Sequence, residues 1–210
     1  MRLRQNGFFF YLCGIMILTL GIALTIQSRL GTSPFDALLV GLHRTVGLTI
    51  GSWEIVVGLT MVLCNALLEK KRPEYFALLT SLFTGIGIDC WVFLFRDWIE
   101  PDSWVGQWIC LLLGLIFTGI GVATYLQSKF APNPMDRSML IISKLTGWTV
   151  TYSRALISII LVLIALLFNG PIGIGTLLNA LFSGVIISFF IPYILLIKSG
   201  LDKAKSTVAS

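Results

Sequence analysis

Long apolar runs separated by short polar breaks fill almost the whole chain. Six of these runs are close to the roughly 20 residues that a helix needs to cross the hydrocarbon core of a bilayer. They are residues 7–28, 51–68, 74–95, 105–127, 151–168 and 173–197. The pattern predicts an all-α polytopic membrane protein with six transmembrane helices.

Two shorter segments, 33–47 and 133–147, follow the first and the fourth of these runs. Each carries ionisable side chains, among them Asp36 and Asp136, which are costly in contact with lipid. We expect both segments to form short re-entrant or half helices. The sequence leaves two other arrangements open, in which the short helices lie flat at the interface or cross completely.

The two short segments belong to an internal repeat with an offset of 100 positions. Identical pairs at this offset include Gly14 and Gly114, Gly21 and Gly121, Gln27 and Gln127, Ser28 and Ser128, Pro34 and Pro134, and Asp36 and Asp136. Apolar sequence matches itself by chance, but Pro, Asp and Gln matched in one register are hard to obtain that way. We therefore predict two repeats, 1–97 and 98–200, followed by a basic tail, 201–210.

Composition agrees with a lipid environment. Only 12% of the 210 residues are charged and 56% are hydrophobic, whereas soluble domains carry about 25% charged residues. The net charge of +5 would suit nucleic acid. The basic residues instead cluster at the ends of apolar runs, as the positive-inside rule expects. The sequence thus predicts the lipid bilayer as a partner and argues against nucleic acid.

The distribution of Lys and Arg also predicts the orientation. Arg2 and Arg4 favour a cytoplasmic N-terminus. If the short segments turn back, Lys70, Lys71 and Arg72 and the C-terminus are cytoplasmic too; if the short segments cross, this basic cluster falls outside. The first arrangement obeys the rule better and leaves an odd number of spans in each repeat. The second repeat is therefore predicted to be inverted relative to the first, as in many secondary transporters.

Both short segments begin with a helix-capping pattern. Ser33 suits the N-cap, Pro34 the first helical position and Asp36 the third. Asn133 and Asp136 repeat the arrangement. In inverted repeats the two helix starts would meet near the midplane, and their free N–H groups would form a polar pocket for an anion, a zwitterion or a hydrated ion. The alternative is a pair of ordinary caps without a ligand.

Three further polar residues are candidates for the same pocket. Asp89 lies well inside the third apolar run, where an ionisable residue is expected to be functional. It would act as a charge partner or proton carrier, or else pair with Arg29 or Arg44 or reach the outer interface. Gln27 and Gln127 end their apolar runs, and each either lines the pocket or caps the preceding helix.

Glu54 and Arg154 occupy equivalent positions at the starts of the spans that follow the short segments. We interpret both as helix-end charges near water. Glu54 suits the positive end of the helix dipole, whereas Arg154 does not. Arg154 is therefore expected to have a specific carboxylate partner, with Asp136 as the first candidate.

The sequence contains no recognisable catalytic or metal-binding motif. Its cysteines lie in apolar runs without C-x-x-C spacing, and its single histidine, His43, has no metal-ligand pattern around it. A Walker A sequence, an H-E-x-x-H motif and a Ser/His/Asp set are all missing. We expect no catalytic residue, no metal and no cofactor, and a protein that is not an enzyme.

A resemblance to a known family rests on three segments. Gly31–Asp36 contains Gly-x-Ser-Pro-aromatic-Asp, and Gly47–Gly51 follows it as Gly-Leu-[Ser/Thr]-x-Gly. Together with Gly21–Thr25, these segments resemble the YczE/YyaS/YitT group of bacterial integral membrane proteins, and its YczE-like branch in particular. The resemblance extends over nearly the whole chain. It implies a location in the bacterial plasma membrane and at most a transport role, without a substrate or a set of binding residues.

These observations predict a small secondary transporter or facilitator of a small polar or charged solute, with its site near the membrane midplane between the repeats. Two alternatives remain open. The protein would otherwise be a non-transporting scaffold or regulator of a partner pathway, or the substrate-binding subunit of a multicomponent transporter. A homo-oligomer or a membrane partner is compatible with all three functions.

Overall fold

The computed structural model describes residues 2–128, 130 and 133–208. These residues form eight α-helices and no β-strand: α1 (Arg2–Gln27), α2 (Pro34–Val46), α3 (Ile50–Glu69), α4 (Phe76–Phe95), α5 (Trp104–Leu126), α6 (Pro134–Thr146), α7 (Val150–Leu167) and α8 (Ile174–Val208). The predicted all-α class is confirmed. Because α8 continues to Val208, most of the predicted tail extends the last helix, and its final two residues lie outside the described part.

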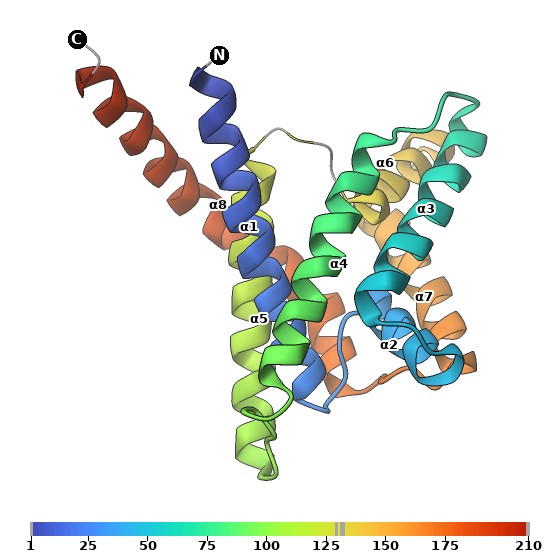
Figure 1. Cartoon of the computed structure of the whole chain (residues 1–210). Coiled ribbons are helices and arrows are strands. Elements are labelled where there is room, and N and C mark those ends of the chain that lie inside the picture. The colour runs from blue at the N-terminus through green and yellow to red at the C-terminus, as the bar shows by residue number, and fades with distance from the viewer. Residues whose placement is uncertain (1, 129, 131–132, 209–210) are drawn as a thin grey trace.

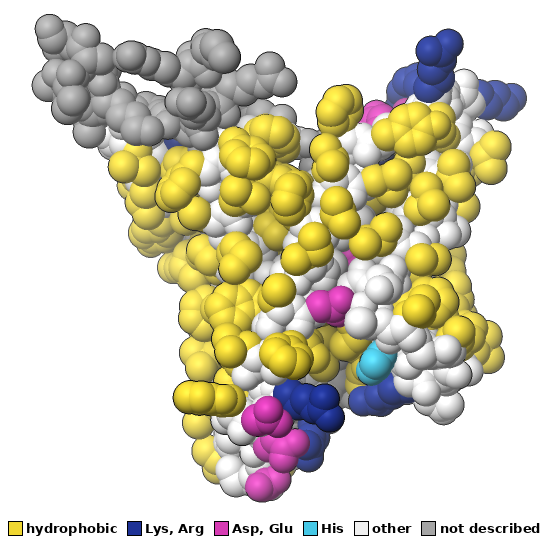
Figure 2. Space-filling model, in the orientation of Figure 1, with side chains coloured by type: hydrophobic (Ala, Val, Ile, Leu, Met, Phe, Trp, Pro, Cys, Tyr) yellow, Lys and Arg dark blue, Asp and Glu magenta, His cyan; other side chains and the backbone are white. Residues whose placement is uncertain are grey.

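Six helices in the described part of the chain are long and apolar enough to cross a membrane, as predicted. The spans are Gly7–Gln27, Ile50–Glu69, Phe76–Phe95, Trp104–Leu126, Val150–Leu167 and Ile174–Leu201. Hydrophobic side chains cover much of the face shown in Figure 2, and most of the charged side chains visible there gather near its two ends. The protein is a multi-pass membrane protein whose long helices contact lipid.

The short helices α2 and α6 have 13 residues each. At 1.5 Å per residue such a helix is about 20 Å long, whereas the hydrocarbon core is about 30 Å thick. In Figure 1, α1 ends and α3 begins toward the same end of the bundle, with α2 between them. The chain around α2 therefore turns back, which agrees with the predicted re-entrant segment.

Glycines allow α1 and α5 to pack closely and in opposite directions. A Cβ atom on Gly21 would lie 2.4 Å from the backbone nitrogen of Thr118, and one on Gly121 would lie 2.3 Å from that of Leu18. The two contacts correspond to each other with the repeats exchanged, because Gly121 is the repeat equivalent of Gly21 and Thr118 that of Leu18, both at the offset of 100 positions. An inverted repeat would produce this exchange, and the inversion of the complete repeats stays a prediction.

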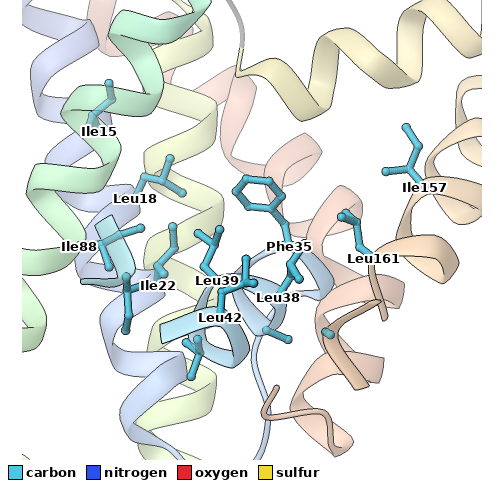
Figure 3. Close-up of a cluster of buried hydrophobic side chains, with 14 of the residues drawn as sticks. Ile15, Leu18, Ile22, Phe35, Leu38, Leu39, Leu42, Ile88, Ile157 and Leu161 are labelled. Atoms are coloured by element: carbon cyan, nitrogen blue, oxygen red, sulfur yellow. The ribbon is translucent and has the colours of Figure 1, made fainter. Parts of the chain in front are cut away.

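Most of helix α2 is buried inside the molecule, whereas its last turn is exposed. Its side chains from Pro34 to Leu42 are buried. In Figure 3, Phe35, Leu38 and Leu39 on α2 lie among apolar side chains of α1, α4 and α7. Because protein surrounds α2, its irregular N-terminal approach is shielded from lipid, which is the condition for such backbone within a bilayer.

The two repeats differ in how their last helices pack. Gly51 on α3 and Gly85 on α4 bring these helices together, since a Cβ on Gly51 would lie 2.1 Å from the carbonyl oxygen of Gly85. Thr151 replaces the first glycine in the second repeat, and a Cβ on the second counterpart, Gly184, would meet no described atom within 4 Å. The α3–α4 packing consequently has no equally extensive α7–α8 counterpart in the described part of the chain.

Candidate functional site

The N-terminal ends of α2 and α6 meet at one cavity inside the bundle. Its volume is about 120 Å³, and all eight described helices contribute to its wall. The predicted residues Ser33, Asp36, Asn133 and Asp136 all line it. The structure thus brings together four candidates that come from two segments of the sequence 100 positions apart.

The α2 side of the cavity is organised by Ser33. Its hydroxyl oxygen accepts a hydrogen bond from the backbone N–H of Asp36 at 3.1 Å, and the hydroxyl donates to Asp36 Oδ2 at 2.5 Å. This is the capping geometry expected from the sequence. Burial raises the pKa of Asp36 to about 6, although the Ser33 hydroxyl opposes the shift. The cap therefore places a carboxyl group that gains and loses a proton near neutral pH against the cavity.

The α6 side has the same pattern with a different partner for its carboxylate. Asn133 Oδ1 accepts from the backbone N–H of Met135 at 3.0 Å. Asp136 Oδ2 instead accepts from the hydroxyl of Tyr125 on α5 at 2.8 Å. Burial raises the pKa of Asp136, while the Tyr125 hydroxyl and the positive charge of Arg154 act in the opposite direction. Two carboxyl groups in unlike surroundings, a buried one on Asp36 and a half-buried one on Asp136, thus face one cavity.

Glu54 and Arg154 also line this cavity. The interpretation of Glu54 as a helix-end charge near water was wrong, because its exposed fraction is 1%. Arg154 Nη2 donates to Ser183 Oγ on α8 at 2.9 Å. Its charge acts on Asp136, the carboxylate expected as its partner, but the described residues show no ion pair between the two. Their equivalent positions in the two repeats were a signal that both belong to the site.

The structure does not bring Asp89, Gln27 or Gln127 to the central cavity. Asp89 and Gln27 line a separate cleft. Asp89 Oδ1 accepts from the backbone N–H of Gly51 at 2.8 Å, which places a negative charge at the start of α3. The backbone carbonyl of Gln127 accepts from Lys198 Nζ. Functional roles for these three residues stay predictions, because none of the three lines the central cavity.

The two arginines considered as partners of Asp89 make other contacts. Arg29 Nη2 lies 3.8 Å from Glu100 Oε1, and both side chains are exposed. Arg44 Nη1 donates to the backbone carbonyl of Asn169 at 3.4 Å. Asp89 is therefore held by a helix terminus rather than by an ion pair with either arginine.

Hydroxyl groups complete the cavity wall and were not predicted from the sequence. Tyr125, Thr84 and Thr118 lie in apolar helices where their spacing gives no motif. The described residues include no group of three or more His, Cys, Asp or Glu side chains arranged to hold a metal ion. The cavity therefore combines apolar wall segments with carboxyl, hydroxyl and amide groups and one guanidinium.

Comparison with known proteins gives a matching family and uncharacterised relatives. Residues 5–192 match a family described as a family of unknown function (DUF6198). The uncharacterised protein YyaS of Bacillus subtilis is 47% identical over 187 residues, which cover 89% of this chain and 93% of that protein. The uncharacterised membrane protein YczE of the same species is 35% identical over 186 residues, covering 87% and 84%. No solved structure matches. The resemblance inferred from the sequence is thereby confirmed.

Proposed function

Because the chain belongs to DUF6198, a family of unknown function, we propose a role from its cavity: a small secondary transporter or facilitator. The solute is small and polar or charged, and it binds near the membrane midplane between the two repeats. The proposal includes no enzymatic step.

One observation carries this proposal. The capped starts of α2 and α6 come from equivalent positions of the two repeats and line a single polar cavity inside a bundle of apolar spans. Transporters with inverted repeats bind their substrates where two interrupted helices begin near the bilayer midplane. A membrane scaffold would have no need for buried carboxyl groups around a central cavity, which are costly in lipid.

The proposed orientation has both termini in the cytoplasm and the protein in the bacterial plasma membrane. The N- and C-terminal ends and the loop between α3 and α4 lie at one end of the bundle in Figure 1. That loop carries Lys71 and Arg72, which favours the cytoplasmic side for this end. The exchange of α1–α5 contacts supports the inverted arrangement of the repeats on which alternating access depends.

Uptake into proteoliposomes tests the proposed function. The purified protein is reconstituted and supplied separately with radiolabelled ethanolamine, glycine, glutamate and glycerol, which represent a cation, a zwitterion, an anion and a neutral solute. We expect protein-dependent uptake of at least one of them. We expect Asp136→Asn to reduce that uptake by about tenfold or more, since the substitution removes a charge from the cavity wall.

Asp102→Asn provides the matched control, because Asp102 is exposed in the loop before α5. This variant should transport like the parent protein. Absence of protein-dependent uptake for every solute in the panel, from vesicles shown to contain folded protein, would contradict the proposed function. Equal uptake by the Asp136→Asn variant would move the site away from this cavity.

A further inference from the structure

Buried polar atoms without a hydrogen-bond partner converge on the central cavity. Within the described residues, Glu54 Oε1, Thr84 Oγ1 and Thr118 Oγ1 are buried and unpartnered, and all three side chains line the cavity. They belong to α3, α4 and α5. Buried polar side chains are nearly always hydrogen-bonded in folded proteins. Three exceptions from separate helices that face one space indicate a site completed by a ligand.

The charge around this space selects the kind of ligand. Asp36, Glu54 and Asp136 contribute three carboxyl groups to the wall, and Arg154 is its one basic side chain among the described residues. The Arg154 guanidinium already donates to Ser183 on α8. The helix starts add partial positive charge, but Ser33 and Asn133 already occupy part of their N–H groups. The wall is therefore acidic and disfavours an anion.

We propose that the cavity binds a small solute through a primary ammonium group, which donates hydrogen bonds to Glu54 and to the hydroxyl oxygens of Thr84 and Thr118. This inference rests on the proposed function, in which the cavity is the solute site. An ammonium group supplies three N–H donors and no acceptor, so it matches three acceptors on different helices.

The arrangement fits an ammonium group better than a metal ion. Divalent cations bound by oxygen require several carboxylates or carbonyls in close coordination. The described residues offer no cluster of three or more acidic, His or Cys side chains with that geometry. A cation that binds by directed N–H donors can use carboxyl and hydroxyl oxygens spread around the cavity. Glu54 is the central residue of this site, because its exposed fraction is 1%, its Oε1 atom has no hydrogen-bond partner among the described residues, and its side chain lines the cavity.

Thermal unfolding of the complete protein in detergent tests the inference with methylammonium chloride as the probe. Sodium chloride and sodium acetate at the same ionic strength are the comparison salts. Methylammonium should raise the unfolding temperature in a saturable manner, as expected for a ligand that binds only the folded state. Sodium acetate should give no rise beyond that of sodium chloride.

Two variants connect this effect to the site. Glu54→Gln should abolish the saturable rise, whereas Glu100→Gln, which changes an exposed carboxylate at the end of the bundle, should retain it. Thr84→Val should stabilise the ligand-free protein because it removes a buried unpartnered hydroxyl, and yet raise the methylammonium concentration at half-saturation by about tenfold. These opposite effects distinguish binding from a general loss of structure.

The inference is overturned if methylammonium gives no saturable rise, if sodium gives an equal one, or if Thr84→Val leaves half-saturation unchanged. Its failure is distinguishable from failure of the proposed function. Saturable methylammonium binding without uptake of any solute of the panel in proteoliposomes would leave the ammonium site standing and remove transport. Uptake of glutamate or glycerol without methylammonium binding would leave transport standing and remove the ammonium site.

Discussion

The hydroxyl of Tyr125 donates a hydrogen bond to Asp136 Oδ2 at 2.8 Å, and this contact joins α5 to the start of α6. Tyr125 is 3% exposed, so its hydroxyl has no water as a ready substitute for this contact. The contact therefore fixes the side chain of Asp136 toward the cavity and stabilises its ionised form.

Removing that hydroxyl should destabilise the protein in a pH-dependent way. Tyr125→Phe should cost about 1.5–3 kcal/mol when Asp136 is ionised, the usual range for a hydrogen bond to a charged group. The loss should be smaller at acidic pH, where Asp136 is protonated. Thermal unfolding of the parent and the variant across pH measures this difference. Tyr152→Phe, at a position that is 68% exposed, should change the stability little. A loss of stability in Tyr125→Phe that does not depend on pH would show that the hydrogen bond does not act on the ionised form of Asp136.

Much of this fold was predictable because a bilayer imposes simple rules on sequence. The lengths of the apolar runs predicted the six spans, and the pair Pro34 and Pro134 located the two short helices. The capping residues Ser33 and Asn133 were predictable for the same reason, since a helix start inside a protein needs a local acceptor for its N–H groups.

The rest of the cavity depended on helix rotation, which apolar sequence specifies weakly. Glu54 stands near the beginning of a span, where a charged residue normally reaches water, so its burial could not be predicted from position alone. Asp89 lies deeper in its span but faces a backbone N–H of α3 instead. The direction of a side chain depends on how its helix packs. The glycines that permit this packing can be found in the sequence, but they do not reveal which face of each helix turns toward the cavity.

The α1–α5 contact predicts a large effect from a small substitution. Gly21→Ala places a methyl group 2.4 Å from the backbone nitrogen of Thr118, so the two helices must separate. Overpacking of this kind costs about 1–3 kcal/mol. The unfolding temperature of the purified variant should fall accordingly.

Gly184→Ala is the matched control for this experiment, because an added Cβ there would meet no described atom within 4 Å. It should be neutral or stabilising by up to about 1 kcal/mol, since alanine favours the helix over glycine. Equal effects of the two substitutions would contradict close packing of α1 against α5.

The buried carboxyl group of Asp36 predicts a fall in stability as pH rises. Burial raises its pKa from 3.8 to about 6, so the folded protein keeps a proton over a range in which the unfolded chain has lost it. The stability contributed by the protonated group is complete below the lower value and is lost as pH rises through the higher one. The unfolding temperature of the parent protein should therefore decrease over this window.

Asp36→Asn should reduce that decrease, because asparagine does not titrate. The remaining slope should diminish further in the variant with both Asp36→Asn and Asp136→Asn, since burial also raises the pKa of Asp136. Asp102→Asn, in an exposed loop, should leave the slope unchanged. An unaltered slope in the double variant would assign the pH dependence to other groups.

A cluster of charges at one end of the bundle links the two repeats and predicts their relative orientation. Glu69 Oε1 on α3 lies 3.7 Å from Lys71 Nζ and 3.9 Å from Lys144 Nζ, at the end of α6. The repeat equivalent of Lys144 is Arg44, which donates to the carbonyl of Asn169, the equivalent of Glu69. In inverted repeats these two corresponding contacts lie on opposite sides of the membrane.

Cysteine labelling with a membrane-impermeant maleimide measures directly on which side of the membrane each contact lies. The experiment uses a variant whose native cysteines are replaced. Lys71→Cys and Lys144→Cys should react only after the cytoplasmic side is opened to the reagent, because both positions flank one acidic residue at the basic end of the bundle. Arg44→Cys and Asp97→Cys should react in intact cells. Labelling of Arg44→Cys and Lys144→Cys from the same side would show that α2 and α6 do not belong to inverted repeats. The orientation inferred from the positive-inside rule would then be wrong as well.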